Sequence, residues 1–214
     1  MRRLESGACS GDQQAALRLM PVSRETAERF VVYVDLLARW SRVTNLISKT
    51  TFGAVWNRHI ADCAQLNLVA PAAIRWVDIG SGAGLPGLVL AMQLADVPGA
   101  LVHCIESDQR KCAFLREAVH ATGSPAIVHP VCVQAVDPAS LGPIDAVTAR
   151  AFAPLSRTLQ LAKVWLERGA VGVFPRGRTL REQLNAVDYA VPYAIDTLAS
   201  VVDGEAAILR VRLN

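Results

Sequence analysis

Residues 74–106 run IRWVDIGSGAGLPGLVLAMQLADVPGALVHCIE, and this stretch decides the fold. It begins with a short apolar run, turns through a cluster of glycines, continues through an apolar segment at residues 86–95 and ends in a second apolar run at residues 100–106. Continuous apolar runs of this length are typical of buried parallel strands, and a helix between two of them provides the crossover. The stretch therefore predicts a strand, a glycine loop, a helix and a second, parallel strand.

The alternation of apolar runs and helical segments continues along the chain. The later runs are residues 126–132 (AIVHPVC), 144–149 (IDAVTA) and 170–174 (AVGVF), with helical segments at residues 108–121 and about 155–166. Residues 189–195 and 206–212 form two more runs around a turn near Asp203 and Gly204, with no helix of useful length between them. Strands connected in this way pair antiparallel. We therefore expect a doubly wound α/β sheet over residues 73–214 that ends in an antiparallel hairpin.

Residues 1–72 have the pattern of a helical N-terminal cap. Residues 1–22 lack periodicity and contain glycines and a proline, so we expect a loose or partly ordered leader. Ser23 is a suitable helix N-cap, and apolar residues follow it at helical spacing as far as Trp40. A second helical segment, ending before Pro71, is expected because Phe52, Val55, Trp56, His59 and Ile60 would line one face of it.

Composition limits the classes of protein that need to be considered. The 214 residues are 52% hydrophobic and 19% charged, enough for one substantial core. A net charge of +3 permits a polyanionic partner without requiring one. The five cysteines lack C-x-x-C spacing, which predicts reduced thiols. No apolar stretch reaches the roughly 18 residues of a membrane span, and no signal peptide follows the N-terminal arginines, so we expect a cytoplasmic protein without membrane contact.

The glycine loop is the strongest local signal of a ligand site. Gly80, Gly82 and Gly84 lie between the first strand and the helix after it. Glycines allow a tight turn there, and their missing side chains admit a ligand to contact with the backbone. A glycine cluster alone is a weak signal, because any tight strand-to-helix turn can contain one.

Two acidic residues indicate which ligand the loop would hold. Glu106 ends the second strand, where a carboxylate can accept hydrogen bonds from the ribose hydroxyls of a nucleoside; the alternative is a solvated acid at a strand end. The loop pattern is G-x-G-x-G rather than the G-x-G-x-x-G of dinucleotide sites, and Asp78 precedes it. A carboxylate would repel a pyrophosphate but suits the cationic S-adenosylmethionine. Asp78 could also cap the following turn with its own side chain.

Six motifs together resemble the RsmG (GidB) family of small-subunit rRNA guanine-N7 methyltransferases, over residues from about 40 to 178. They are Asn45-Leu46, WNRHIADC at residues 56–63, DIGSGAGLPG at 78–87, ESDQRKCAFLRE at 106–117, VTARAFAPL at 147–155 and PRGR at 175–178. The resemblance implies a class I S-adenosylmethionine-dependent methyltransferase, Rossmann-like with a mostly parallel seven-stranded sheet, that methylates guanine N7 in the decoding region of 16S rRNA.

The resemblance also implies cofactor contacts at particular positions. They fall on Gly80 and Leu85 in the loop, on Ala135 and Val136 after the third strand, and on Arg150. To this set we add Asp78, Gly82, Gly84 and Glu106, on the physical grounds given above. The family usually has arginine-x-glutamate where this chain has Gln134-Ala135-Val136, so a side-chain carboxylate near the adenine edge is absent and the effect on cofactor affinity is open.

Basic and amide groups near the cofactor are candidates for binding RNA. They are Asn45, Arg58, His59 and Arg176, with Arg176-Gly177 standing where the family has lysine-glycine. Arg150 could contact the cofactor, hold RNA, or form a buried ion pair with Asp145 or Asp78. His59 could equally be a core histidine whose hydrogen bonds are satisfied inside the protein.

Methylation at N7 places few demands on acid–base chemistry, because this nitrogen already has an unprotonated lone pair. We expect alignment of the two substrates to be the main contribution, with no general base and no metal. Two alternatives stay open: a class I methyltransferase acting on a small molecule or protein, and a nucleotide-binding module without catalysis. The sequence does not show whether free RNA, a precursor particle or the mature subunit is the substrate, and a monomer is the default expectation.

Overall fold

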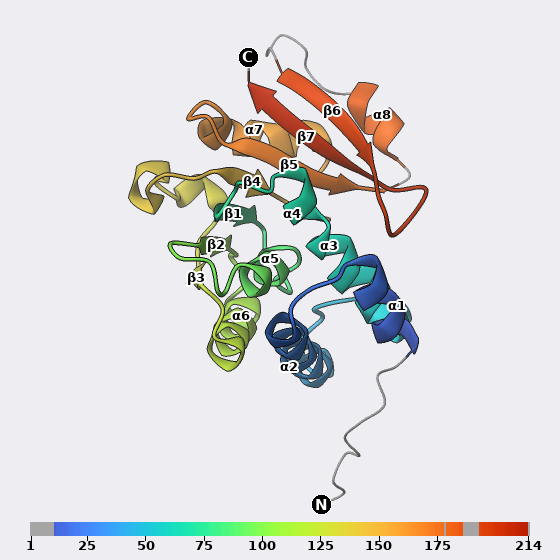
Figure 1. Cartoon of the computed structure of the whole chain (residues 1–214). Coiled ribbons are helices and arrows are strands. Elements are labelled where there is room, and N and C mark those ends of the chain that lie inside the picture. The colour runs from blue at the N-terminus through green and yellow to red at the C-terminus, as the bar shows by residue number, and fades with distance from the viewer. Residues whose placement is uncertain (1–10, 178, 186–192, 214) are drawn as a thin grey trace, which may run out of the picture.

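A computed structural model of the protein describes residues 11–177, 179–185 and 193–213 (Figure 1). Its centre is a seven-stranded sheet with the order β3-β2-β1-β4-β5-β7-β6. The strands are β1 (Arg75–Ile79), β2 (Leu101–Ile105), β3 (Ala126–His129), β4 (Ala146–Thr148), β5 (Val171–Arg176), β6 (Tyr193–Ala199) and β7 (Ala207–Leu213).

The first five strands are parallel, and the last two are antiparallel. β6 and β7 are joined through a turn in which the amide of Ala206 donates to the carbonyl of Asp203, as the sequence predicts. Residues 189–192, where we expected the first hairpin strand to begin, lie outside the described residues. Because β1 lies between β2 and β4, the loops that follow these three strands meet at one edge of the sheet.

Helices cover both faces of the sheet (Figure 1). On one face, α2 (Arg24–Trp40), α5 (Gly87–Gln93) and α6 (Gln109–Thr122) contribute to one core cluster with Trp76 and Val102. On the other face, α7 (Leu155–Leu166) packs in a second cluster with Val77 and Phe174. Shorter elements are η3 (Val133–Ala135), η4 (Pro138–Leu141) and α8 (Leu180–Asn185). No helix among the described residues is long and apolar enough to cross a membrane.

The N-terminal region differs from the loose or partly ordered leader that we expected over residues 1–22. Residues 1–10 are not described, but Gly11–Leu19 form helix α1. The Asp12 carboxylate accepts hydrogen bonds from the amides of Trp56 (2.8 Å) and Asn57 (3.3 Å) and from the Asn57 side chain (2.6 Å). These amides begin a helix and have no partner within it, so a distant acid caps them. This contact fixes α1 and corrects the expectation for residues 11–19.

Helix α2 begins as the sequence predicts. The Ser23 hydroxyl accepts a hydrogen bond from the amide of Thr26 at 3.1 Å, which is an N-cap. Farther along the helix, Tyr33 is fully buried and its hydroxyl donates to the carbonyl of Ala83 at 2.6 Å. The cap helix is thereby bonded to the glycine loop after β1.

Residues 49–69 form a broken helical path instead of the single helix that we expected. It consists of the 3-10 helix η1 (Lys49–Ala54), the π-helix η2 (Trp56–Ala61), α3 (Asp62–Ala64) and α4 (Leu66–Val69). Val55, Trp56, His59 and Ile60 are buried, so most of the predicted apolar face exists. π-helical turns are rare and frequently occur at functional sites, where they change the direction of side chains.

Candidate active site

The glycine loop turns sharply between β1 and α5. Gly80, Gly82 and Gly84 have φ values of 67°, 55° and 81°, in the left-handed region that favours glycine. A Cβ at Gly84 would collide with Leu88, whereas a Cβ at Gly82 would meet no heavy atom closer than the Gly80 carbonyl oxygen, at 3.8 Å. Gly84 is therefore required for packing, and Gly82 presents open backbone to a cavity.

Glu106 lies at the end of β2, beside this loop. One carboxylate oxygen accepts from the amide of Gly82 at 2.9 Å and the other accepts from the amide of Asp108 at 2.8 Å. The residue is only 8% exposed. It is therefore a fixed acceptor rather than a solvated acid, and each oxygen keeps a lone pair for a ligand hydroxyl.

Asp78 lies beneath the loop and is fully buried. Its Oδ2 accepts from the amide of Gly87 at 3.0 Å, so the side chain caps the start of α5, as one alternative from the sequence proposed. Its Oδ1 has no hydrogen-bond partner among the described residues. Burial raises the pKa of this carboxyl to about 7, against the lowering effect of its hydrogen bond with the amide of Gly87. Asp78 does not line the cavity above it.

A cavity of about 640 Å³ lies above the loop. Five of the predicted cofactor residues line it: Gly80, Gly82, Leu85, Glu106 and Arg150. The other four do not line the cavity: Asp78, Gly84, Ala135 and Val136. Val133 and Gln134, which directly precede Ala135, do line it. Other residues of the wall were not predicted as cofactor contacts, among them Leu46, Ser107, Val131, Cys132 and Phe152.

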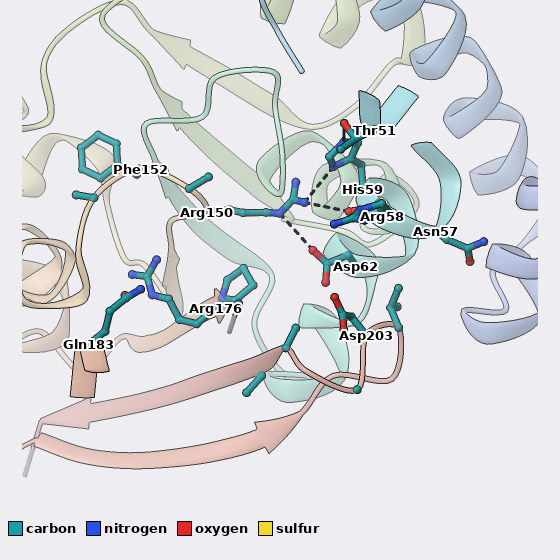
Figure 2. A pocket seen from close by; sticks show the side chains of 18 of the residues that line it. Thr51, Asn57, Arg58, His59, Asp62, Arg150, Phe152, Arg176, Gln183 and Asp203 are labelled. Carbon is teal, nitrogen blue, oxygen red and sulfur yellow. Dashed lines mark hydrogen bonds and ion pairs between the residues drawn. The ribbon is translucent and has the colours of Figure 1, made fainter. Parts of the chain in front are cut away.

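A second cavity of about 980 Å³ adjoins the first (Figure 2). Three predicted RNA-binding residues line it: Arg58, His59 and Arg176. Asn45 is exposed and lines neither cavity. Asp62, Gln183 and Asp203 also line this second cavity, and they were not predicted as site residues. Both cavities share the wall formed by residues 150–152 together with Thr51 and His59.

Arg150 links the cap to the sheet at this shared wall. Its Nε lies 3.2 Å from Asp62 Oδ2, and its Nη2 donates to the Arg58 carbonyl at 3.0 Å (Figure 2). The buried ion pair with Asp145 or Asp78 that the sequence suggested is therefore not formed; Arg150 pairs instead with Asp62, and both side chains are about one-fifth exposed. Asp145 instead accepts from the backbone amides of residues 74 and 75.

His59 is held in one protonation state by its neighbours. Arg150 Nη2 lies 3.0 Å from His59 Nδ1, and since a guanidinium only donates, Nδ1 accepts. His59 Nε2 therefore has the proton and donates to the Thr51 hydroxyl, 3.0 Å away, which in turn donates to the Ser48 carbonyl. Burial, and next the charge of Arg150, lowers the pKa of His59 to about 4. The imidazole is neutral at physiological pH and has both nitrogens paired.

Arg176, at the end of β5, is a buried cation. It is 7% exposed, and its Nη2 donates to the Thr158 hydroxyl at 3.0 Å. Among the described residues its Nε has no hydrogen-bond partner and no ion pair involves it. Burial lowers the pKa of the guanidinium. The guanidinium carbon lies 5.9 Å from the centroid of the Phe174 ring, a contact that compensates the charge only in part. A buried charge without an anionic partner is costly, so a cavity that exposes it favours an anionic ligand.

The strand order, the open glycine loop and the fixed carboxylate of Glu106 define a class I S-adenosylmethionine-dependent methyltransferase. The residues fit that cofactor, because open backbone at Gly82 lies beside an acceptor suited to ribose hydroxyls. The chain belongs to the family rRNA small subunit methyltransferase G (GidB), which matches residues 26–204. The family and the enzyme class predicted from the sequence are confirmed.

Curated relatives agree with this assignment. The chain is 46% identical over 183 residues to the ribosomal RNA small subunit methyltransferase G of Nitrobacter hamburgensis. This match covers 86% of this chain and 70% of that protein. It is 45% identical over 190 residues to the protein of the same name from Methylorubrum extorquens (strain PA1), which covers 89% and 90%.

Two solved structures confirm the predicted fold class. Cofactor-bound Rv0187 from MTB has a TM-score of 0.57 and 17% identity, covering 95% of this chain and 96% of that chain. A mutant of MtNAS in complex with S-adenosylmethionine has a TM-score of 0.53 and 14% identity, covering 94% and 83%. At these identities the likeness shows the fold alone.

Proposed function

We propose that this enzyme transfers the methyl group of S-adenosylmethionine to N7 of a guanosine in the decoding region of 16S rRNA. The observation that supports this most directly is the junction of the two cavities at residues 150–152. One cavity has the open glycine backbone and Glu106, which suit a nucleoside cofactor. The other has arginines, which suit a nucleotide substrate.

Cofactor binding is assigned to the residues that line the smaller cavity. Glu106 would accept hydrogen bonds from the ribose hydroxyls, and the backbone of Gly80, Gly82 and Leu85 would contact the cofactor. Asp78 would act from beneath the loop, through the amide of Gly87 that it holds. Gly84, Ala135 and Val136 would shape the surrounding backbone.

The transfer itself needs alignment more than acid–base chemistry. The N7 lone pair of guanosine is free to attack the methyl carbon, so no proton has to leave before the bond forms. His59 is neutral, and its two ring nitrogens are already paired with Arg150 and Thr51. We therefore assign His59 to holding the shared wall in place. Well-oriented reactants can gain up to about 7 to 11 kcal/mol from proximity alone.

RNA binding is assigned to the cationic side of the larger cavity. Arg176 lacks an acidic partner among the described residues and would pair with a phosphate. Arg58 is exposed at the rim and would contribute long-range attraction, and Asn45 would contact RNA outside the cavities. Arg150 is already occupied by Asp62 and Arg58, so we assign it to positioning the wall. We further propose that the enzyme acts as a cytoplasmic monomer without a metal, which sedimentation of the active protein and assays in chelator would test.

The deciding experiment measures rRNA methylation in cells that lack the gene. We expect 16S rRNA from the deletion strain to lose one N7-methylguanosine, and purified protein with S-adenosylmethionine to restore it. Free 16S rRNA, precursor particles and mature subunits would be compared as substrates. Unchanged N7-methylguanosine in the deletion strain would refute the proposal. Methyl transfer to a small molecule or protein, with none to rRNA, would favour the alternative of a class I methyltransferase that acts on such a substrate.

The cofactor assignment is tested by Gly82→Asp with Gly123→Asp as its matched control. Both glycines have left-handed φ values, 55° and 62°, and open space where a Cβ would project, but only Gly82 lines the cavity. Backbone strain should lower the stability of both variants similarly, by about 1 kcal/mol. We expect calorimetry to show loss of S-adenosylmethionine binding in Gly82→Asp only. Retained affinity in that variant would place the cofactor elsewhere.

A further inference from the structure

Phe152 occupies a position that the cofactor and RNA assignments above do not explain. It follows β4 and lines both cavities, with its side chain 40% exposed. Of the large hydrophobic side chains that are exposed within the described residues, it is the one aromatic. A single exposed apolar side chain is common, but this one lies where two cavities meet, and an aromatic ring there offers a flat surface to a ligand.

The backbone holds this ring in place. Ala151, just before it, has a φ of 49°, which is unusual for a residue with a side chain and persists only where the surroundings enforce it. Arg150, the residue before Ala151, is anchored by its contacts with Asp62, Arg58 and His59. Phe152 therefore follows an anchored residue and a residue with an unusual backbone conformation.

The ring also lies directly against the glycine loop. A Cβ at Gly80 would overlap the Phe152 ring, so the ring packs on the bare backbone of the loop that lines the cofactor cavity. The residue also lines the cavity that contains Arg176, and Figure 2 draws both side chains among those that line it. A flat ligand resting on the ring at the junction of the two cavities would therefore lie beside the cofactor cavity and near the cationic groups.

We propose that Phe152 is the stacking platform for the target purine, which leaves its RNA stack and lies against the ring before methyl transfer. This inference rests on the proposed function, because it assumes a nucleotide substrate. Enzymes that modify a base must bring it out of the stack, and aromatic rings commonly receive it. The base would stack on Phe152 with its N7 edge turned toward the cofactor cavity, where Glu106 would hold the cofactor, while its phosphates approach Arg176.

The test compares Phe152→Ala, Phe152→Leu, Phe152→Tyr and Phe152→Trp. Leucine keeps an apolar side chain but no π-face, while tyrosine and tryptophan keep the π-face. Loss of one base stack corresponds to about a 5- to 150-fold loss of affinity. We expect kcat/KM for 16S rRNA to fall by that factor in the alanine and leucine variants and to be retained with tyrosine or tryptophan. S-Adenosylmethionine affinity by calorimetry should stay within about twofold of wild type.

RNA binding in the presence of S-adenosylhomocysteine provides a readout that does not depend on turnover. The same order of variants is expected in the Kd of a guanosine-containing rRNA fragment. Ile127→Ala, which truncates an exposed apolar side chain on β3 outside both cavities, is the matched control and should behave as wild type.

Each failure has a separate signature. Full activity and RNA affinity in Phe152→Leu would overturn the stacking role. Loss of S-adenosylmethionine affinity in the alanine and leucine variants, with unchanged RNA binding, would also overturn it and would place the ring against the cofactor. If wild type methylates no rRNA, the proposed function fails instead. The RNA-binding comparison then still decides whether the ring stacks on a base.

Discussion

The buried carboxyl of Asp78 should make the stability of this protein depend on pH in an unusual direction. Burial raises its pKa from 3.8 to about 7 in the folded state. An acid with a raised pKa binds a proton more strongly when folded, so its stabilising contribution is complete below about pH 4. That contribution is lost as the pH rises through the folded pKa. The slope is about 1.4 kcal/mol per pH unit between the two pKa values.

Asp78→Asn isolates this contribution, because the amide oxygen can still accept from the amide of Gly87 but cannot ionise. The wild-type curve alone would mislead, since the lowered pKa values of His59 and His103, each about 4, give a slope of the opposite sign. The difference in the free energy of unfolding between variant and wild type removes these other groups. Between about pH 5 and pH 7.5 we expect the variant to gain stability relative to wild type, with the difference in the free energy of unfolding rising by about 2 to 3 kcal/mol.

Urea denaturation of the cofactor-free protein at several pH values measures that difference. Asp96→Asn is the control: Asp96 is exposed, and its hydrogen bond with Arg29 lowers its pKa. Asp96 is ionised in both folded and unfolded states throughout this range. The difference in the free energy of unfolding between Asp96→Asn and wild type should therefore not change with pH. A flat difference for Asp78→Asn as well would refute the reasoning, because the buried carboxyl would then ionise as easily as a solvated one.

Three further variants test contacts between distant parts of the chain. Tyr33→Phe leaves the buried carbonyl of Ala83 without its hydrogen bond; urea denaturation should show a loss of about 1 to 2 kcal/mol, and an unchanged stability would mean that water replaces the hydroxyl. Asp12→Ala removes the cap of η2 and should lower the free energy of unfolding by about 1 kcal/mol, whereas Asp12→Asn should lose less. Asp62→Asn leaves the Arg150 cation without its anion; we expect a loss of about 2 kcal/mol and slower methyl transfer, and unchanged values for both would show that the ion pair is dispensable.

The fold could be predicted from the sequence because its main signals are local. Each apolar run, such as residues 74–79, needs burial on both faces, and each intervening segment has helical spacing. Ser23 and the glycine loop likewise indicate their structures through adjacent residues. The boundary between cap and methyltransferase domain at residues 72 and 73 stays a prediction, since one core cluster extends across it.

Contacts between residues far apart in the chain could not be predicted in this way. Asp12 orders α1 only because residues 56 and 57 fold beside it, and nothing near Asp12 indicates this. Asp62 was missed as the partner of Arg150 for the same reason. Phe152 belongs to the motif at residues 147–155, yet its exposure and its contact with Gly80 depend on the loops after β1 and β4 meeting at one edge. A general signal was available there, since aromatic residues after a central strand are candidates for base contacts.

The hydrogen bond from Tyr33 to Ala83 has a consequence for protein engineering. A minimal enzyme trimmed to begin at β1 would keep every strand and the glycine loop. The carbonyl of Ala83 would nevertheless lose its hydrogen-bond donor, and α5 and α6 would expose the apolar surface that α2 covers. Exchanging the N-terminal helices between related enzymes would meet the same obstacle unless the donor side chain is transplanted with its helix. For this scaffold, residues 24–40 belong in any shortened version that is expected to hold its methyl donor.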